Sequence, residues 1–276
     1  MISFGPFHFE IAVLLRNSML INGTLTNAEI WYNFSKAEIK EFENMDKIFF
    51  SKLLEVPGTT PYEAYYLELG VLPVGAILKG RRANFLHNIL NREESSMLYT
   101  FFITQWMNPT KGDWTDQVKQ DLEDLGIPCC FEYIRSKSKL AFKSLVKSKV
   151  EEYALKTLKA KQSSHSKMDN VHYNSLKMQS YFTSTDFKPS VKKTIFKYRV
   201  RMERFGENFR GGEISVPCPL CGLHLDNQEM SLQCPEVKNE VEIKGKLSEI
   251  YKTEINSEII ETIVKITEYR KQILEY

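Results

Sequence analysis

The chain has 276 residues, of which 42% are hydrophobic and 26% are charged, a composition that suits a globular protein with one or two cores. Its first ten residues lack the pattern of a signal peptide, and the apolar run at residues 11–15 is far too short to span a bilayer. Five cysteines do not suit a secreted disulfide framework. We therefore expect an intracellular protein, nuclear or cytoplasmic, with no membrane partner.

The net charge of +2 conceals an uneven distribution along the chain. Residues 135–210 contain 19 lysines and arginines against 6 aspartates and glutamates, whereas the segments on either side are acidic. A basic middle between acidic flanks is typical of a protein with a polyanion partner. A lysine-rich helical surface that only meets solvent would give the same counts.

Apolar residues recur at helical spacing along most of the chain, so the expected fold class is mainly α. Ser35 and Glu38 predict a capping box, Gly70 predicts a helix end, and Asp113 predicts an N-cap. Almost no strand is expected outside a turn that contains cysteines. The predicted helices span residues 9–31, 37–54, 61–69, 74–91, 97–106, 114–125, 137–160, 176–182, 190–205 and 250–273.

Residues 162–170 are polar and rich in serine, which makes them the best linker candidate. They separate a helical region, residues 1–160, from a second region, residues 171–276. The second region combines a basic helix, the cysteine turn and a closing helix. We expect two domains with these bounds.

The cysteine turn has the spacing of a zinc knuckle, because Cys218 and Cys221 are separated by two residues and Cys234 follows. A tetrahedral site needs a fourth ligand, and His224 is the nearest candidate. A histidine four residues before Cys234 would complete a stronger motif, but Met230 stands there, and a thioether is a poor zinc ligand. The alternative is a set of reduced cysteines without metal. Another pair, Cys129 and Cys130, is expected in the core.

Two helices carry the basic residues that suit phosphate contacts. The predicted helix at 190–205 has an apolar face for docking and can present cations on its other face. The predicted helix at 74–91 carries three more cations on its expected exposed side. The candidates are Lys193, Lys197, Arg199, Arg201 and Arg204 in the first and Lys79, Arg81 and Arg82 in the second. A solvated helix surface is the alternative.

In order along the chain, several segments resemble the C-terminal portion of a reverse transcriptase from a non-LTR (LINE-like) retrotransposon. The segments are Leu15 to Leu20 with Asn27 to Tyr32, Thr60 to Gly70 through Arg82, Tyr198 to Met202 with Asn208 and Phe209, and Cys218 to Cys221 with Gln228, Glu229 and Cys234. The resemblance covers most of the chain. It implies a thumb-like helical bundle followed by a helical domain with a small Cys-x-x-Cys knuckle.

The chain departs from this family in two ways. It begins at what resembles the thumb, so the regions that hold the polymerase aspartates have no counterpart and no catalytic residue is carried over. Met230 stands where the family has its knuckle histidine, so only Cys218, Cys221 and Cys234 transfer as metal ligands, and His224 is a substitute suggested by position alone.

Two functions are favoured by these sequence features. The first is a truncated reverse-transcriptase tail that contacts the phosphates of RNA, target DNA or a template–primer through Arg16 and the candidates named above, without catalysing polymerisation itself. Its parent would be an RNA-directed DNA polymerase, whose remaining part is an expected partner, and zinc is the expected cofactor. The second is a helical protein-interaction scaffold, domesticated from such an element, that uses its basic surface or an aromatic cluster. That cluster consists of Tyr99, Phe101, Phe102, Trp106 and Trp114.

Overall fold

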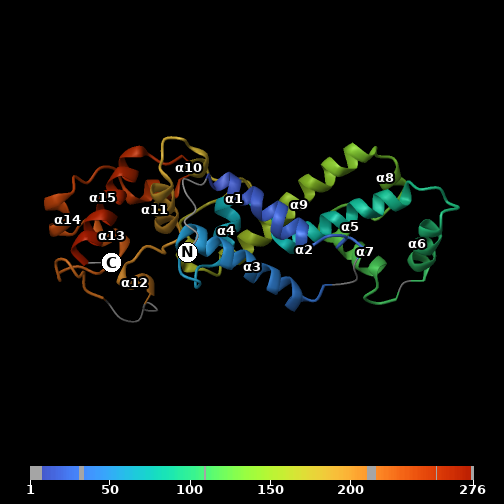
Figure 1. Cartoon of the computed structure of the whole chain (residues 1–276), viewed down its shortest axis with the longest axis horizontal. Coiled ribbons are helices and arrows are strands. Elements are labelled where there is room, and N and C mark those ends of the chain that lie inside the picture. Colours follow the sequence, from blue (N-terminus) through green and yellow to red (C-terminus); the bar gives the residue numbers. More distant parts are fainter. Residues whose placement is uncertain (1–7, 31–33, 109, 210–215, 253, 275–276) are drawn as a thin grey trace. The chain divides into compact units, whose positions relative to one another are not determined.

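The computed structural model describes residues 8–30, 34–108, 110–209, 216–252 and 254–274. The described residues are mainly helical and form no β-strand (Figure 1). Two isolated antiparallel bridges join Leu69 to Met178 and Pro217 to Leu225. The expected mainly-α fold class is therefore confirmed. Among the described helices, none combines the length and the apolar character needed to cross a membrane.

Several helix boundaries follow from local sequence signals, as expected. Ser35 and Glu38 form the capping box: Ser35 N–H donates to Glu38 Oε2 at 2.7 Å, and Glu38 N–H donates to Ser35 Oγ at 3.2 Å. The Asp113 carboxylate accepts from Asp116 N–H at 2.8 Å and starts α7, Trp114–Asp124. Gly70 ends α4, Tyr62–Leu69, in the left-handed conformation.

The chain folds into two compact units, and each contains more than one segment of sequence. Unit 1 comprises residues 1–13, 47–70 and 160–276, and unit 2 comprises residues 14–46 and 71–159. This division differs from the expected bounds of 1–160 and 171–276, because residues 47–70 group with the C-terminal part of the chain. The expected linker belongs to unit 1, where the Gln162 side-chain amide donates to the carbonyls of Met168 and Val171 at 2.8 and 2.7 Å.

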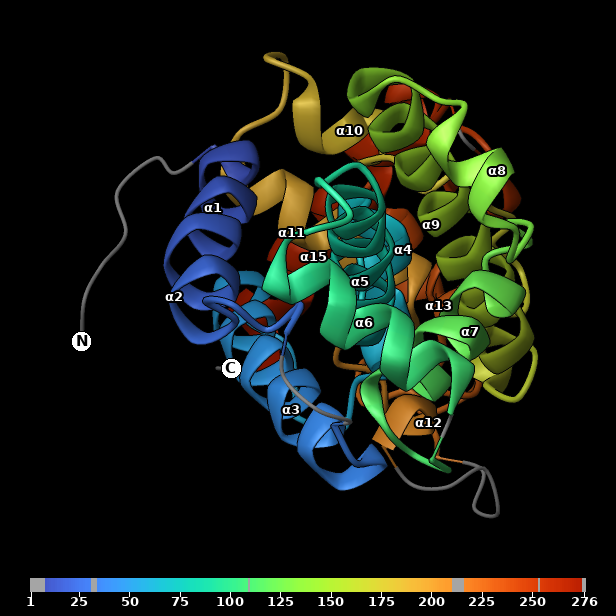
Figure 2. The same ribbon diagram turned by 90° about the vertical axis from the view of Figure 1, so that its right-hand side faces the viewer.

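Unit 2 is built around α5, which contacts α6, α7 and α8 (Figure 2). A cluster of Ile21, Leu25, Ala28, Val74 and Leu78 forms one of its cores. The first predicted helix, 9–31, is divided, and its Trp31 lies outside the described residues. The elements of unit 2 are a π-helix at Arg16–Ile21, α2 at Asn22–Thr24, the first part of α3 at Lys36–Leu54, α5 at Val74–Leu90, α6 at Met97–Met107, α7, α8 at Phe131–Arg135, and most of α9 at Lys139–Gln162.

In unit 1, α11 packs against α15, α10 and the 3₁₀ helix at Leu247–Tyr251. The basic helix is shorter than the predicted 190–205, because Arg201 adopts a left-handed φ of 49° after α11 ends. Ile259, Ile263 and Ile266 of the closing helix are buried, as their spacing predicts. The other elements are most of α1 at Phe9–Leu15, the last part of α3, α4, a 3₁₀ turn at Ser166–Met168, α10 at Ser180–Thr183, α11 at Pro189–Arg199, α12 at Gly206–Phe209, α13 at Gln228–Ser231, α14 at Pro235–Glu240 and α15 at Ser257–Leu274.

The expectation that Cys129 and Cys130 lie in the core is wrong, because both side chains are exposed. They follow Pro128 in the connection between α7 and α8, where the backbone is extended and Cys130 is the N-cap of α8. Cys130 Sγ lies 2.9 Å from the exposed Glu132 carboxylate. Cysteine is often buried by packing, but a short connection between helices runs over the surface.

Gly70 has a packing role beyond its helix-ending turn. Its φ is +63°, and a Cβ atom there would lie 2.2 Å from the backbone nitrogen of Met178. We expect Gly70→Ala to lower the free energy of unfolding by more than about 2 kcal/mol, because strain and a backbone clash add together. Gly126 has the same φ of +63° but nothing within 4 Å of its Cβ position, so Gly126→Ala is the control and should cost only about 1 kcal/mol. Urea denaturation of both variants measures this difference; equal losses would contradict it.

Candidate metal centre and basic residues

The segment around Cys218 and Cys221 folds as a tight turn held by backbone hydrogen bonds. Gly222 takes a left-handed φ of +66°, and its N–H donates to the Cys218 carbonyl at 2.8 Å. Cys218 N–H donates to the His224 carbonyl at 2.6 Å, next to the bridge between Pro217 and Leu225. The turn places both cysteine side chains on one side, as the Cys-x-x-Cys spacing predicts.

Three sulfur atoms converge at this turn, from Cys218, Cys221 and Cys234. All three lie within 4.8 Å of one another, and the Sγ atoms of Cys218 and Cys234 are 3.9 Å apart. Two thiolates bonded to one zinc ion at about 2.3 Å in a tetrahedral site lie about 3.8 Å apart. The cluster packs with Val237 of α14 and Ile266 of α15, so two helices help to fix its position. The three cysteines are therefore close enough to hold a metal ion.

The local electrostatics favour a thiolate at Cys221 and disfavour it at Cys234. Backbone N–H groups of His224 and Leu223 point at the Cys221 sulfur and lower the pKa of its thiol. Burial raises the pKa of Cys234 to about 11. Metal binding deprotonates thiols, and backbone N–H donors that face the sulfur stabilise the resulting negative charge. The donor set therefore fits a soft or borderline cation.

The fourth ligand expected at His224 is not part of the cluster that the structure forms. Among the described residues, the converging donor atoms come from the three cysteines alone. His224 contributes instead through its backbone, whose carbonyl and N–H groups order the turn. Met230 lies in α13, where its N–H donates to the Asn227 side chain at 2.7 Å. The Cys-x-x-Cys motif with Cys234 predicted the three sulfur ligands. It did not predict that His224 would act through its backbone.

Three arginines predicted to contact phosphates are buried in ion pairs within the chain. Arg16 is 2% exposed and forms a bidentate ion pair with the carboxylate of Asp46. Arg82 is 5% exposed and pairs with Asp121 at 2.5 Å, so the expectation that it lies on the exposed side of its helix is wrong. Arg199 is also buried. In this structure the three guanidinium groups face acidic partners of the same unit.

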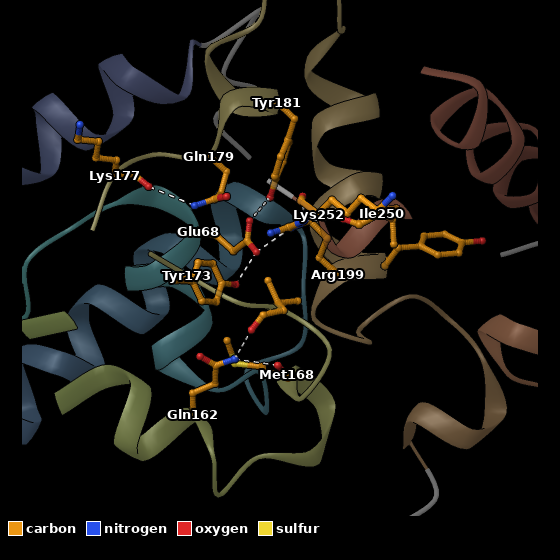
Figure 3. Close-up of polar contacts among 12 residues, drawn as sticks. Glu68, Gln162, Met168, Tyr173, Lys177, Gln179, Tyr181, Arg199, Ile250 and Lys252 are labelled. Atoms are coloured by element: carbon orange, nitrogen blue, oxygen red, sulfur yellow. Dashed lines mark hydrogen bonds and ion pairs between the residues drawn. The ribbon is translucent and has the colours of Figure 1, made fainter. Parts of the chain in front are cut away.

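Arg199 belongs to a buried network centred on the carboxylate of Glu68 (Figure 3). One Glu68 oxygen accepts from Arg199 Nε at 2.8 Å and from the Tyr173 hydroxyl at 2.5 Å, and the other accepts from the Tyr181 hydroxyl at 2.8 Å. Arg199 also donates to the carbonyl of Ile250. Burial raises the pKa of both tyrosines well above its ordinary value, so their hydroxyls remain hydrogen-bond donors. The network joins α4, the segment after α9, and α11.

The other predicted cations are half-buried or exposed, and most of them contact other groups of the chain. Those groups are acidic for Lys79, which pairs with Asp121 and Asp124, for Lys193, which pairs with Glu55, and for Arg201, which pairs with Glu229. Arg81 instead donates to the Leu25 carbonyl and the Asn22 side chain. Lys197 is half-buried and Arg204 is exposed, and both line a pocket beside Pro217 and Pro219.

Helix α9 carries basic residues that are not among the predicted phosphate contacts. Lys139, Lys143 and Lys147 are exposed and spaced four residues apart, whereas Phe142 and Val146 of the same helix are buried. Residues four apart lie on one helix face about 6 Å apart along the axis. The three lysines therefore form a row, which we call the α9 lysine row. Their spacing in the sequence was the signal that could have identified it.

The fold and the site define a helical protein with a compact three-cysteine cluster and a row of exposed lysines on α9. No protein-family model matches the chain, and neither do curated proteins or solved structures.

Proposed function

We propose that the chain binds the phosphate backbone of RNA or DNA, as the tail region of a reverse transcriptase of the non-LTR type that its sequence resembles. The observation that supports this most is the α9 lysine row, Lys139, Lys143 and Lys147, which carries no acidic residue within its span. Lysines on one helix face attract a polyanion without reading its base sequence. Lys197 and Arg204 of unit 1 provide a second set of basic side chains.

The proposal includes zinc as a structural metal held by Cys218, Cys221 and Cys234. The separations of these sulfurs and the backbone N–H groups at Cys221 support that assignment. When bound, the metal would hold the Cys218 turn to the start of α14, since Cys234 directly precedes that helix. The role of this metal is to order the fold, as in other sites with cysteine ligands.

Charge reversal of the α9 lysine row tests the proposal. The double variant Lys143→Glu with Lys147→Glu is expected to weaken binding of a fluorescent single-stranded RNA or DNA oligonucleotide by about tenfold or more. The plot of log affinity against log salt concentration should become shallower by about 1.5, because two phosphate contacts are lost. Fluorescence anisotropy at several salt concentrations measures both quantities.

The matched control is Lys111→Glu with Lys238→Glu, which changes the net charge by the same amount at two exposed positions elsewhere. The control should bind almost as tightly as the unmodified chain. Equal weakening of oligonucleotide binding in both double variants would show that net charge explains the effect, and would contradict a specific role for the α9 lysine row. An unmodified chain that binds none of the oligonucleotides would exclude the proposed function.

A protein-interaction scaffold remains the second candidate, because α6 exposes large apolar side chains. Phe101 is 68% exposed, and Met97 and Met107 are 76% and 73% exposed. Phe101 also lines a shallow apolar pocket together with Phe102 and Trp114. Exposed apolar groups of this size favour contact with another protein. Phe101→Ser should leave oligonucleotide binding unchanged under the first function, whereas a scaffold would lose its protein partner.

A further inference from the structure

A polar pocket of about 450 Å³ lies in unit 2, between the end of α5 and the connection from α8 to α9. Its lining includes two asparagines, Asn88 and Asn91, and three cationic residues, Arg135, Lys137 and Lys139. None of the residues that line it is acidic. A pocket lined by cations and amides without a carboxylate offers its occupant mainly hydrogen-bond donors and positive charge.

The wall of this pocket is held in place by buried contacts. His87 is 4% exposed, its Nε2 atom lies 2.9 Å from the Lys137 carbonyl, and its ring stacks on Phe142 at 4.6 Å between centroids. Arg135 Nε donates to the Leu90 carbonyl at 2.8 Å. These contacts fix the backbone from which the cations project. A pre-organised wall lowers the entropy cost of binding an ion.

The side chains that line the pocket differ in how many hydrogen bonds and ion pairs they already form within the chain. Arg135 donates to the Tyr99 hydroxyl at 3.0 Å and lies 3.5 Å from the exposed Glu94 carboxylate, so part of its charge is compensated. Lys139 and Asn88 are exposed, and among the described residues neither side chain has a hydrogen-bond or ion-pair partner. The Lys137 ammonium lies over the Tyr133 ring, 4.5 Å from its centroid, so the donors that remain available are the Lys139 ammonium and the Asn88 carboxamide. Lys143 continues the same positive surface along α9.

We propose that this pocket binds a phosphate group, and that the group is a backbone phosphate of the nucleic acid. This inference rests on the proposed function, because the α9 lysine row adjoins the pocket through Lys139. Phosphate oxygens accept hydrogen bonds from ammonium and amide groups and carry the charge that the lining compensates. The pocket fixes one phosphate, and Lys143 and Lys147 contact the strand that continues from it.

Asn88→Asp tests the pocket without a change of side-chain size. It places a carboxylate in the wall, and we expect affinity for a single-stranded oligonucleotide to fall about tenfold. Asn239→Asp makes the same substitution at an exposed position of α14 and should leave affinity nearly unchanged. Lys139→Gln should make the slope of log affinity against log salt concentration shallower by about 0.7, the change expected for one phosphate contact on a single strand. Circular dichroism confirms that each variant is folded.

The outcomes separate the pocket from the proposed function. If the unmodified chain binds oligonucleotides and Asn88→Asp binds them as tightly as Asn239→Asp, the pocket proposal is overturned and the proposed function stands. If no oligonucleotide binds, inorganic phosphate becomes the probe, in NMR spectra of protein labelled at asparagine. Shifts of the Asn88 and Asn91 amide signals in phosphate but not in chloride would then support a site for free phosphate, and unchanged signals would exclude the pocket.

Discussion

Arg199→Met is expected to lower the free energy of unfolding of unit 1 by about 3–5 kcal/mol, because it leaves the buried charge of Glu68 without its partner. The pair is almost completely excluded from water, with side-chain exposures of 1% and 0%. The hydroxyls of Tyr173 and Tyr181 would still donate to Glu68, but neutral donors do not replace a guanidinium. Urea denaturation monitored by circular dichroism measures the loss.

Arg201→Met is the matched control, since Arg201 lies two residues further along and carries the same side chain. Its pair with Glu229 is exposed, at 32% and 45%, and such surface pairs contribute less than about 1 kcal/mol. Combining Arg199→Met with Glu68→Gln should recover part of the loss, because the amide keeps one acceptor for the tyrosines and leaves no buried charge. Similar losses for Arg199→Met and Arg201→Met would show that the network does not stabilise the fold.

Cys218→Ser is expected to abolish zinc binding and to destabilise unit 1, because two sulfurs cannot hold the metal that three hold. The unmodified chain, purified in the presence of zinc, should contain about one equivalent of metal and lose thermal stability when a strong chelator removes it. Mass spectrometry under native conditions gives the stoichiometry. Differential scanning calorimetry with and without chelator gives the change in Tm.

Cys129→Ser is the control for this substitution, because Cys129 is exposed and lies outside the cluster. It should leave both the metal content and the response to chelator unchanged. His224→Ala should also retain the metal, since His224 acts on the turn through its backbone. Absence of zinc from the unmodified chain would contradict the metal assignment, and loss of zinc in His224→Ala would return the imidazole to the ligand set.

The features that the sequence predicted well depend on residues close together in the chain. The capping box at Ser35, the N-cap at Asp113 and the helix end at Gly70 are set by hydrogen bonds and backbone angles within a few residues. The Cys218 turn belongs to the same group, because two cysteines separated by two residues converge whenever the turn closes. Its third sulfur, from Cys234, was also apparent from the motif.

The basic residues show where this kind of prediction fails. A lysine or arginine on the polar side of a predicted helix is expected to be exposed. Whether it is buried instead depends on an acidic partner that lies far away in the sequence. Arg199 pairs with Glu68, which lies 131 positions earlier in the chain, and Arg82 pairs with Asp121, which lies 39 positions later. A buried cation requires such a pair, since an isolated charge is too costly to remove from water.

The sequence by itself determined the mainly helical fold, the positions of several caps and the three-cysteine turn, because each depends on local backbone preferences and spacing. Only the tertiary structure decided which cations face solvent and how the chain divides into units. Residues 47–70 join the C-terminal part of the chain in unit 1, where Glu68 meets Arg199. Contacts between distant segments depend on burial and charge compensation in three dimensions, which no local pattern encodes.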